Sequence, residues 1–179
     1  MNDKEEIKKT ILELLSKDTK MHQKWLAGGL LEKLHDKDLD RKNREEIKKI
    51  LNTIGWPKIS EYGEEVSNAT FILVQHAFDD VPLQEEALSM MKALPEGEVR
   101  KRSIAMLEDR ILIAKGKPQL YGTQFDVDKK TGSVEAKPIK DIGSLDERKS
   151  EMEMDSFDKE KKRIYKLYIK EETGPEERY

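Results

Sequence analysis

The sequence predicts a mainly α-helical single domain with one small β-hairpin. Apolar residues recur at helical spacing through most of the 179 residues, whereas one segment near residue 120 alternates apolar and polar side chains. Charged residues make up 40% of the chain, and its 34 basic and 37 acidic side chains are interspersed. Interspersed charge of this kind is typical of solvated helix faces, so we expect ordered helices.

One globular domain is the expected organisation. A chain of 179 residues lies within the size range of a single domain and can bury roughly two-thirds of its unfolded surface. No internal repeat and no low-complexity linker divides it. We therefore expect residues 1–179 to form one domain.

The first third of the chain predicts three helices, over residues 4–16, 22–34 and 43–54. The first and the third carry isoleucine or leucine every three or four residues, which places these side chains on one helix face. A polar run at 36–40 separates the second helix from the third. Gly55 and Pro57 end the third helix as a rigid corner. Trp56, between them, is a candidate for stacking on a ligand, and the alternative is that it packs the helix junction.

The middle of the chain predicts three more helices, over 60–77, 83–94 and 98–114. Ser60 is the expected N-cap of the first, and Asp80 is a candidate cap of the second, which opens at Pro82. The third helix is apolar on nearly all sides, which is typical of a buried helix. Its charged turn, Glu108 to Arg110, would then need partners from elsewhere in the fold.

The segment 116–125 is rich in uncharged hydrogen-bonding side chains, whereas the sequence around it is rich in charged residues. The alternation that follows predicts a hairpin whose strands cover 119–127 and 133–137, with Gly132 at a positive φ at the end of the connection. A short helix capped by Ser144 and a final amphipathic helix are expected after it, over 144–148 and 157–168.

Composition excludes several classes of function. The chain has no cysteine, so it can hold neither a disulfide nor a thiolate-bound metal. Its formal net charge of −3 provides no general attraction for nucleic acid or for an anionic membrane. No apolar run approaches membrane-spanning length, and the N-terminus is too charged for a signal peptide. We therefore expect a cytoplasmic protein that binds neither nucleic acid nor membrane.

His76 lies on the inward stripe of the helix predicted over 60–77. An imidazole there is a candidate general base or ligand-binding group, with Gln75 beside it. The alternative is a core histidine whose nitrogens bond to neighbouring residues. Asp79 and Asp80 follow closely, but no second histidine stands at metal-binding spacing, so no metal site is predicted.

Asp109 and Arg110 form a second candidate for chemistry. An arginine presents a planar fork that binds carboxylates and phosphates, and an aspartate can orient it or another donor. Adjacent helix positions diverge by about a hundred degrees, so we expect the two side chains to meet different partners. The alternative is a buried ion-pair network that joins this helix to its neighbours.

The predicted first strand carries a third candidate. Gln119, Tyr121 and Thr123 would point one way and Gln124 the other. Gly122 would let a ligand or another backbone approach closely, and a bulge there would bring the two glutamines together. Amides and hydroxyls suit recognition of a polar ligand, whereas catalysis would need a titratable group from elsewhere in the chain.

Several motifs in order give the chain a family resemblance. They are Gly55-Trp56-Pro57, Gln75-His76, Asp109-Arg110, Gln119-x-Tyr121-Gly122-Thr123-Gln124, Pro138-Ile139 and Asp146-Glu147-Arg148. With them, the chain resembles a widespread bacterial family known only as a domain of unknown function. The resemblance covers about residues 40–150, with the N-terminal helices and the charged C-terminal helix as extensions. It implies membership, and it implies neither an activity nor a cofactor.

The leading hypothesis is a pocket for a polar small molecule, with hydrolase or transferase chemistry. His76 would be the base and Arg110 would stabilise negative charge, with Asp109 as the third catalytic candidate. The candidate ligand-binding residues are Trp56, Gln75, Gln119, Tyr121, Thr123 and Gln124. The competing hypothesis is a non-catalytic module that binds a protein partner and whose polar motifs form a structural buried network. A toxin or immunity component is a third alternative, favoured only by the short length and high charge.

Overall fold

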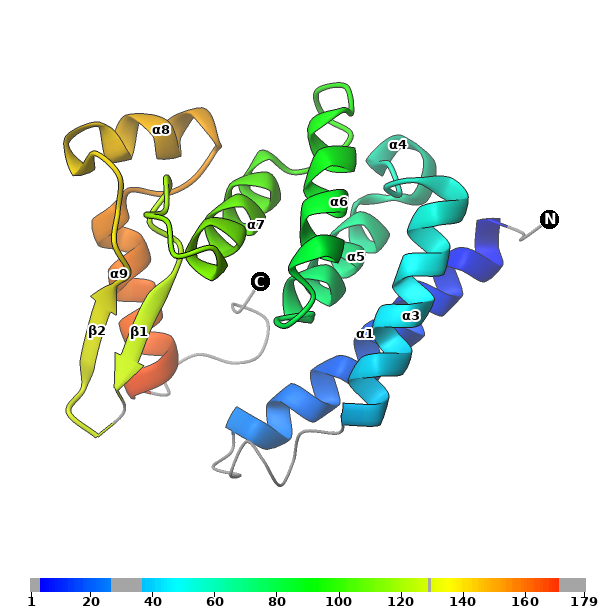
Figure 1. Ribbon diagram of the computed structural model, residues 1–179, viewed down its shortest axis with the longest axis horizontal. Coiled ribbons are helices and arrows are strands. Elements are labelled where there is room, and N and C mark those ends of the chain that lie inside the picture. Colours follow the sequence, from blue (N-terminus) through cyan, green and yellow to red (C-terminus); the bar gives the residue numbers. More distant parts are fainter. Residues whose placement is uncertain (1–3, 27–36, 129, 171–179) are drawn as a thin grey trace. The chain divides into compact units, whose positions relative to one another are not determined.

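The computed structural model describes residues 4–26, 37–128 and 130–170 (Figure 1). The chain divides into two compact units, Met1–Arg100 and Lys101–Tyr179, which we describe separately. Across the described residues there are eight α-helices and one two-stranded antiparallel hairpin. The predicted class, mainly α with a single hairpin, is therefore confirmed.

The first unit consists of helices: α1 (Lys4–Leu26), α3 (Lys37–Ile54), α4 (Ile59–Tyr62), α5 (Glu64–His76) and α6 (Val81–Lys92). Helix α5 is central, because α1, α3, α4 and α6 all pack against it. It buries nine of its 13 residues. Helices α1 and α3 also pack against each other, and they lie side by side in Figure 1. This three-helix contact holds the residues of the candidate site.

The N-terminal helices differ from the prediction. Helix α1 does not end at Ser16 but continues to Leu26, because residues 17–21 contain neither glycine nor proline to stop it. The first residues of the helix predicted over 22–34 therefore belong to α1, and the others lie outside the described residues. The polar run expected as a break is helical from Lys37 onward. Its aspartates lie in the first turn of α3, where they complement the helix dipole.

The expected cap at Ser60 is wrong. Ser60 lies inside the short helix α4, and α5 begins after Gly63, whose φ of 90° separates the two helices. The Ser60 hydroxyl instead donates to the Glu98 carboxylate at 2.8 Å, and the Ser60 N–H donates to the same carboxylate at 3.0 Å. The corner after α3 is confirmed, with Gly55 at a φ of 71°.

The expected cap at Asp80 is confirmed. Its carboxylate accepts a hydrogen bond from the Leu83 N–H at 3.1 Å, at the N-terminus of α6. The same carboxylate lies 2.5 Å from Nζ of Lys48 on α3. Asp80 therefore starts one helix and joins it to another.

Replacing Asp80 by alanine is expected to lower the free energy of unfolding by about 1–2 kcal/mol, because both the cap and the ion pair are lost. Asp79→Ala is the matched control, since the Asp79 side chain is 78% exposed and its loss is expected to change stability by less than about 0.5 kcal/mol. Urea denaturation of the two variants measures the difference. Equal effects would show that Asp80 does not act as a cap.

The second unit begins with α7 (Lys101–Ala114) and continues with the hairpin strands β1 (Phe125–Asp128) and β2 (Ser133–Ala136). The strands are antiparallel, with Phe125 opposite Ala136. A 3-10 turn, η1 (Ile142–Ser144), then leads into α8 (Leu145–Glu151), α9 (Phe157–Tyr165) and the π-helical turn η2 (Lys166–Lys170). Helix α9 packs on β2 and on α8.

Four predictions about the second unit need correction. Helix α7 begins at Lys101 and not at 98, and α8 extends to Glu151. Ser144 provides no side-chain cap, because its hydroxyl donates to Asp141 at 2.6 Å. The first strand begins only at Phe125, so the segment 119–124 is not a strand, although Gln119 forms an isolated bridge with Ile139. The positive φ at Gly132 is confirmed, at 73°.

Within the described ranges, no helix is both long enough and apolar enough to cross a membrane.

Candidate functional site

In the first unit, His76 is paired with a buried carboxylate. His76 is the last residue of α5, and its Nδ1 lies 2.6 Å from Oδ2 of Asp18 on α1. The side chains of His76 and Asp18 are only 10% and 4% exposed. A carboxylate this close accepts a hydrogen bond from a protonated Nδ1, so Nε2 is the nitrogen that can take up a proton. A histidine oriented by an aspartate is the arrangement that general bases use.

A small pocket lies beside this pair, between α1, α3 and the end of α5. The residues that line it are Asp18, Asp40, Asn43, Arg44, Leu73, His76, Ala77 and Asp79. The space open to a water-sized sphere is about 10 Å³, which is room for about one water-sized group. The pocket therefore admits part of a ligand and not a whole one.

Asn43 brings an unusual amide to this pocket. It lies on α3 and is 6% exposed, and neither its Nδ2 nor its Oδ1 has a hydrogen-bond partner. A buried polar group without a partner costs about 1–3 kcal/mol, so native proteins keep few of them. Asn43 is thus a destabilising feature placed next to a histidine–carboxylate pair.

The turn that follows His76 is held in place from two sides. Arg44 and Lys48 on α3 form ion pairs with Asp79 and Asp80. Nε2 of Gln84, on α6, donates to the carbonyl oxygens of Val74 and Ala77 at 3.3 and 3.1 Å, and it thereby satisfies carbonyls at the C-terminus of α5. These contacts fix the position of the His76 backbone.

No metal centre is formed by these acidic residues. Asp79 and Asp80 face cationic side chains, and within the described part of the chain no three histidine or carboxylate side chains are grouped so as to hold a metal ion.

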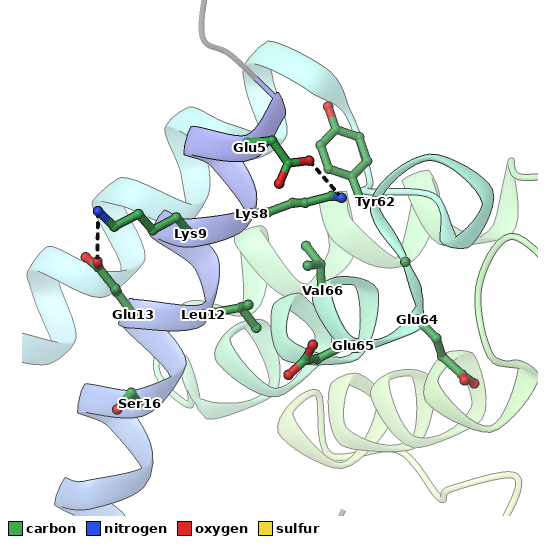
Figure 2. Close-up of a pocket in the computed structure, with 11 residues that line it drawn as sticks. Glu5, Lys8, Lys9, Leu12, Glu13, Ser16, Tyr62, Glu64, Glu65 and Val66 are labelled. Atoms are coloured by element: carbon green, nitrogen blue, oxygen red, sulfur yellow. Dashed lines mark ion pairs between the residues drawn. The ribbon is translucent and has the colours of Figure 1, made fainter.

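A larger hollow in the first unit has a different character (Figure 2). It is an open groove of about 610 Å³ between α1 and the junction of α4 with α5. Leu12 and Val66 face it from the two sides. Its lysines pair with acidic residues of their own helix, Lys8 with Glu5 at 3.0 Å and Lys9 with Glu13 at 3.9 Å. It therefore lacks the converging polar groups that mark the pocket at His76.

In the second unit, Asp109 organises the loop before the hairpin. It is fully buried on α7, and its Oδ1 accepts hydrogen bonds from the N–H groups of Leu120 at 2.7 Å and Tyr121 at 3.0 Å. Its Oδ2 accepts from both the N–H and the hydroxyl of Thr123 at 3.0 Å. Burial raises the pKa of Asp109, while these donors oppose the shift by stabilising the charged form. The backbone donors that a strand would offer to a neighbour are directed to Asp109, which explains why 119–124 is not a strand.

Gln119 completes this arrangement with its own side chain. Its Nε2 donates to the carbonyl oxygens of Gln124 and Lys137, both at 2.9 Å, and its Oε1 accepts from the Gln124 N–H at 2.8 Å. The side chain is fully buried, and all these partners are backbone atoms. The two glutamines are thus brought together by a loop and not by a strand bulge.

Gly122 permits a close approach, as its position in the motif suggests. Its φ is 66°, and a Cβ atom there would lie 3.0 Å from the ring of Phe157 on α9. The Phe157 ring in turn stacks on Phe125 at a centroid distance of 5.9 Å. The group that approaches Gly122 is therefore a side chain of the same unit.

Arginines of α7 and α8 lie half-buried in the second unit. The Arg148 guanidinium donates to the Leu120 and Lys140 carbonyl oxygens at 2.9 and 2.7 Å. Burial lowers the pKa of Arg110 to about 10, and Tyr168 acts in the opposite direction. Asp109 and Arg110 thus meet different partners, as their adjacent positions on one helix indicate.

The residues singled out in the sequence fall into two groups. The first unit contains Trp56, Gln75 and His76. The second unit contains Asp109, Arg110, Gln119, Tyr121, Thr123 and Gln124. The structure brings Asp109 together with the segment 119–124. Trp56 is buried in the corner after α3, where its Nε1 donates to the Ser67 hydroxyl at 3.0 Å.

Sequence reasoning missed Asp18, Asn43 and Arg44, which all line this pocket. A signal was present for Asp18 and for Asn43. Asp18 falls four residues after Leu14 and three before Met21, on the apolar stripe of α1. Asn43 falls four residues before Ile47 on the stripe of α3. A polar residue on an apolar stripe is a candidate for a specific role.

Comparison with known proteins gives one match. The model of a family described as "Family of unknown function (DUF6624)" matches residues 27–169. The match extends beyond the range 40–150 over which the motifs were recognised, and it includes all of α9 and most of η2. Neither the curated proteins nor the solved structures include a match to the chain.

Proposed function

We propose that the first unit of this chain, which belongs to the DUF6624 family of unknown function, binds a polar ligand beside His76 and transfers a proton to or from that ligand. One observation carries the proposal. The buried His76–Asp18 contact of 2.6 Å lies in the same pocket as an amide without hydrogen-bond partners. Buried polar groups that are hydrogen-bonded are common in protein cores, whereas buried polar groups without a partner are rare.

The proposed chemistry is of the hydrolase or transferase type. His76 acts as general base through Nε2, and Asp18 holds the ring and stabilises the imidazolium that forms. The cation that lines the same pocket is Arg44. We therefore assign charge stabilisation to Arg44.

The orientation of His76 gives a direct test. We expect NMR of the imidazole nitrogens to show a protonated Nδ1 for His76 in the neutral ring, because Asp18 accepts that hydrogen bond. His76→Gln identifies the signal among the three histidines of the chain. In Asp18→Asn, the preference for this tautomer is expected to weaken. A neutral ring protonated at Nε2 would contradict the proposed role of Asp18.

Catalysis is tested with generic chromogenic acyl esters. His76→Gln is expected to lower the hydrolysis rate at least about 100-fold, and Asp18→Asn by a smaller factor. Both variants need an unfolding midpoint close to that of the parent for the comparison to hold. Folded variants that hydrolyse the esters at the rate of the parent would contradict the catalytic proposal.

A second candidate, the non-catalytic interaction module, is favoured by the second unit. There the side chains of Asp109 and Gln119 bond to backbone groups of the segment 120–124 and of Lys137, which is how a structural network uses such residues. The same ester assay separates the candidates, because a pure interaction module has no rate for His76→Gln to lower.

A further inference from the structure

We propose that Asn43 recognises the ligand, and that the ligand presents a neutral planar carboxamide-like group attached to an apolar or aromatic body. This inference rests on the proposed function, because it names the class of ligand that the pocket at His76 takes. The argument comes from the hydrogen-bonding capacity, the charge and the size of the pocket.

Hydrogen-bonding capacity points to a group that both donates and accepts. The Asn43 side chain offers a carbonyl oxygen as acceptor and an NH₂ group as donor, and neither has a partner. A carboxamide or the amide-like edge of a nucleobase satisfies both at once through two parallel hydrogen bonds. An ammonium group only donates and a carboxylate only accepts, so each would leave half of Asn43 unsatisfied.

The charge around the pocket disfavours an anion. Asp18, Asp40 and Asp79 line it, against the cation Arg44 and the His76 ring. Arg44 already forms an ion pair with Asp79. Lys48 and Asp80, which flank this region, are paired with each other. A carboxylate or phosphate would therefore meet an excess of negative charge.

The size of the pocket and the residues around it indicate where the rest of the ligand lies and that it is apolar. The pocket has room for one small group, so the body of the ligand has to lie outside it. Phe78 offers an apolar surface there, because its side chain is 52% exposed and its ring lies 5.9 Å from the His76 ring. Arg44 lines the pocket beside Asn43, and its partner Asp79 is 78% exposed. Exposed ion pairs of this kind hold side chains weakly.

Benzamide is the probe that tests this inference, with benzoate and benzylamine as matched compounds of the same size. We expect benzamide to bind the full chain with a Kd of about 1–10 mM, as suits so small a ligand, and to shift the NMR signals of the Asn43 and His76 side chains. Benzoate and benzylamine are expected to bind at least about tenfold more weakly.

Asn43→Leu removes the amide while it keeps a side chain of similar size. We expect it to weaken benzamide binding at least about tenfold and to leave the unfolding midpoint unchanged or higher, because it eliminates two unpaired groups. Asn52→Leu is the matched control, since Asn52 is exposed on the same helix, and it is expected to bind as the parent does. Asn43→Ala serves as a second variant that also removes the amide.

Several outcomes would overturn the inference. These are no binding of benzamide, equal binding of all three compounds, or full binding by both Asn43 variants. A lower midpoint with unchanged binding would show that Asn43 has a structural role. None of these results affects the His76 tautomer or the ester assay, so failure of the inference and failure of the proposed function can be told apart.

Discussion

Replacement of Asp109 by asparagine is expected to lower the free energy of unfolding of the second unit by about 3–4 kcal/mol at neutral pH. Asparagine has nearly the same shape but replaces one acceptor oxygen with a donor. Oδ1 accepts from two backbone N–H groups, and Oδ2 accepts from the N–H and the hydroxyl of Thr123. Whichever oxygen the amide nitrogen replaces, it faces a buried backbone donor, so at least one N–H loses its partner.

Asp126→Asn is the control for this prediction. The Asp126 side chain is 71% exposed in the same unit and pairs with Lys137, so its loss is expected to change stability by less than about 0.5 kcal/mol. Denaturant unfolding of the two variants gives the comparison. If Asp109→Asn costs less than about 1 kcal/mol, the carboxylate is not what organises the loop, and the segment 119–124 must be held by its other contacts.

The role of Asp109 explains why the sequence predicts the hairpin only in part. Alternation of apolar and polar residues runs through 119–127, and such alternation alone indicates a strand. The backbone donors of the first half are taken by a side chain 11 to 14 residues earlier, on α7. A contact of this kind cannot be read from periodicity, because it depends on where α7 packs against the loop in three dimensions.

Sequence signals that involve only neighbouring residues predicted the structure well. Gly55 and Gly132 have a positive φ, and Asp80 caps α6, because each effect involves only residues close in sequence. Ser60 satisfies the same local rule, yet the carboxylate of Glu98, 38 residues away, binds it instead. The rule therefore fails where a distant acceptor competes with the local one.

The pocket at His76 also depends on contacts between residues distant in sequence, and the sequence carries one signal for them. Its histidine was identified from the apolar stripe of α5, but Asp18 lies 58 residues away, and nothing in the sequence pairs the two. What the sequence does show is that Asp18 and Asn43 interrupt apolar stripes. A search for polar residues on predicted inward faces would have found both, without showing that they share a pocket.

Replacement of Gln119 by leucine is the second large effect that we expect, a loss of about 3 kcal/mol in the free energy of unfolding of the second unit. Leucine fits the fully buried site in size but makes none of the three hydrogen bonds of the amide. The Gln124 N–H and the carbonyl oxygens of Gln124 and Lys137 would lose these bonds. Because the Lys137 N–H donates to the Gln124 carbonyl at 3.0 Å, that oxygen keeps one partner, which limits the loss.

Gln124→Leu provides the matched control from the same motif. The Gln124 side chain is half-buried, and its amide donates only to the Thr123 hydroxyl at 3.1 Å, so we expect a loss below about 1 kcal/mol. The two variants change the same residue type five positions apart, and thermal and urea unfolding measure both. A difference between them would show that Gln119 holds the loop through the backbone. Equal, small losses would instead mean that the amide of Gln119 is dispensable for folding, and a ligand-binding role for this motif would then regain support.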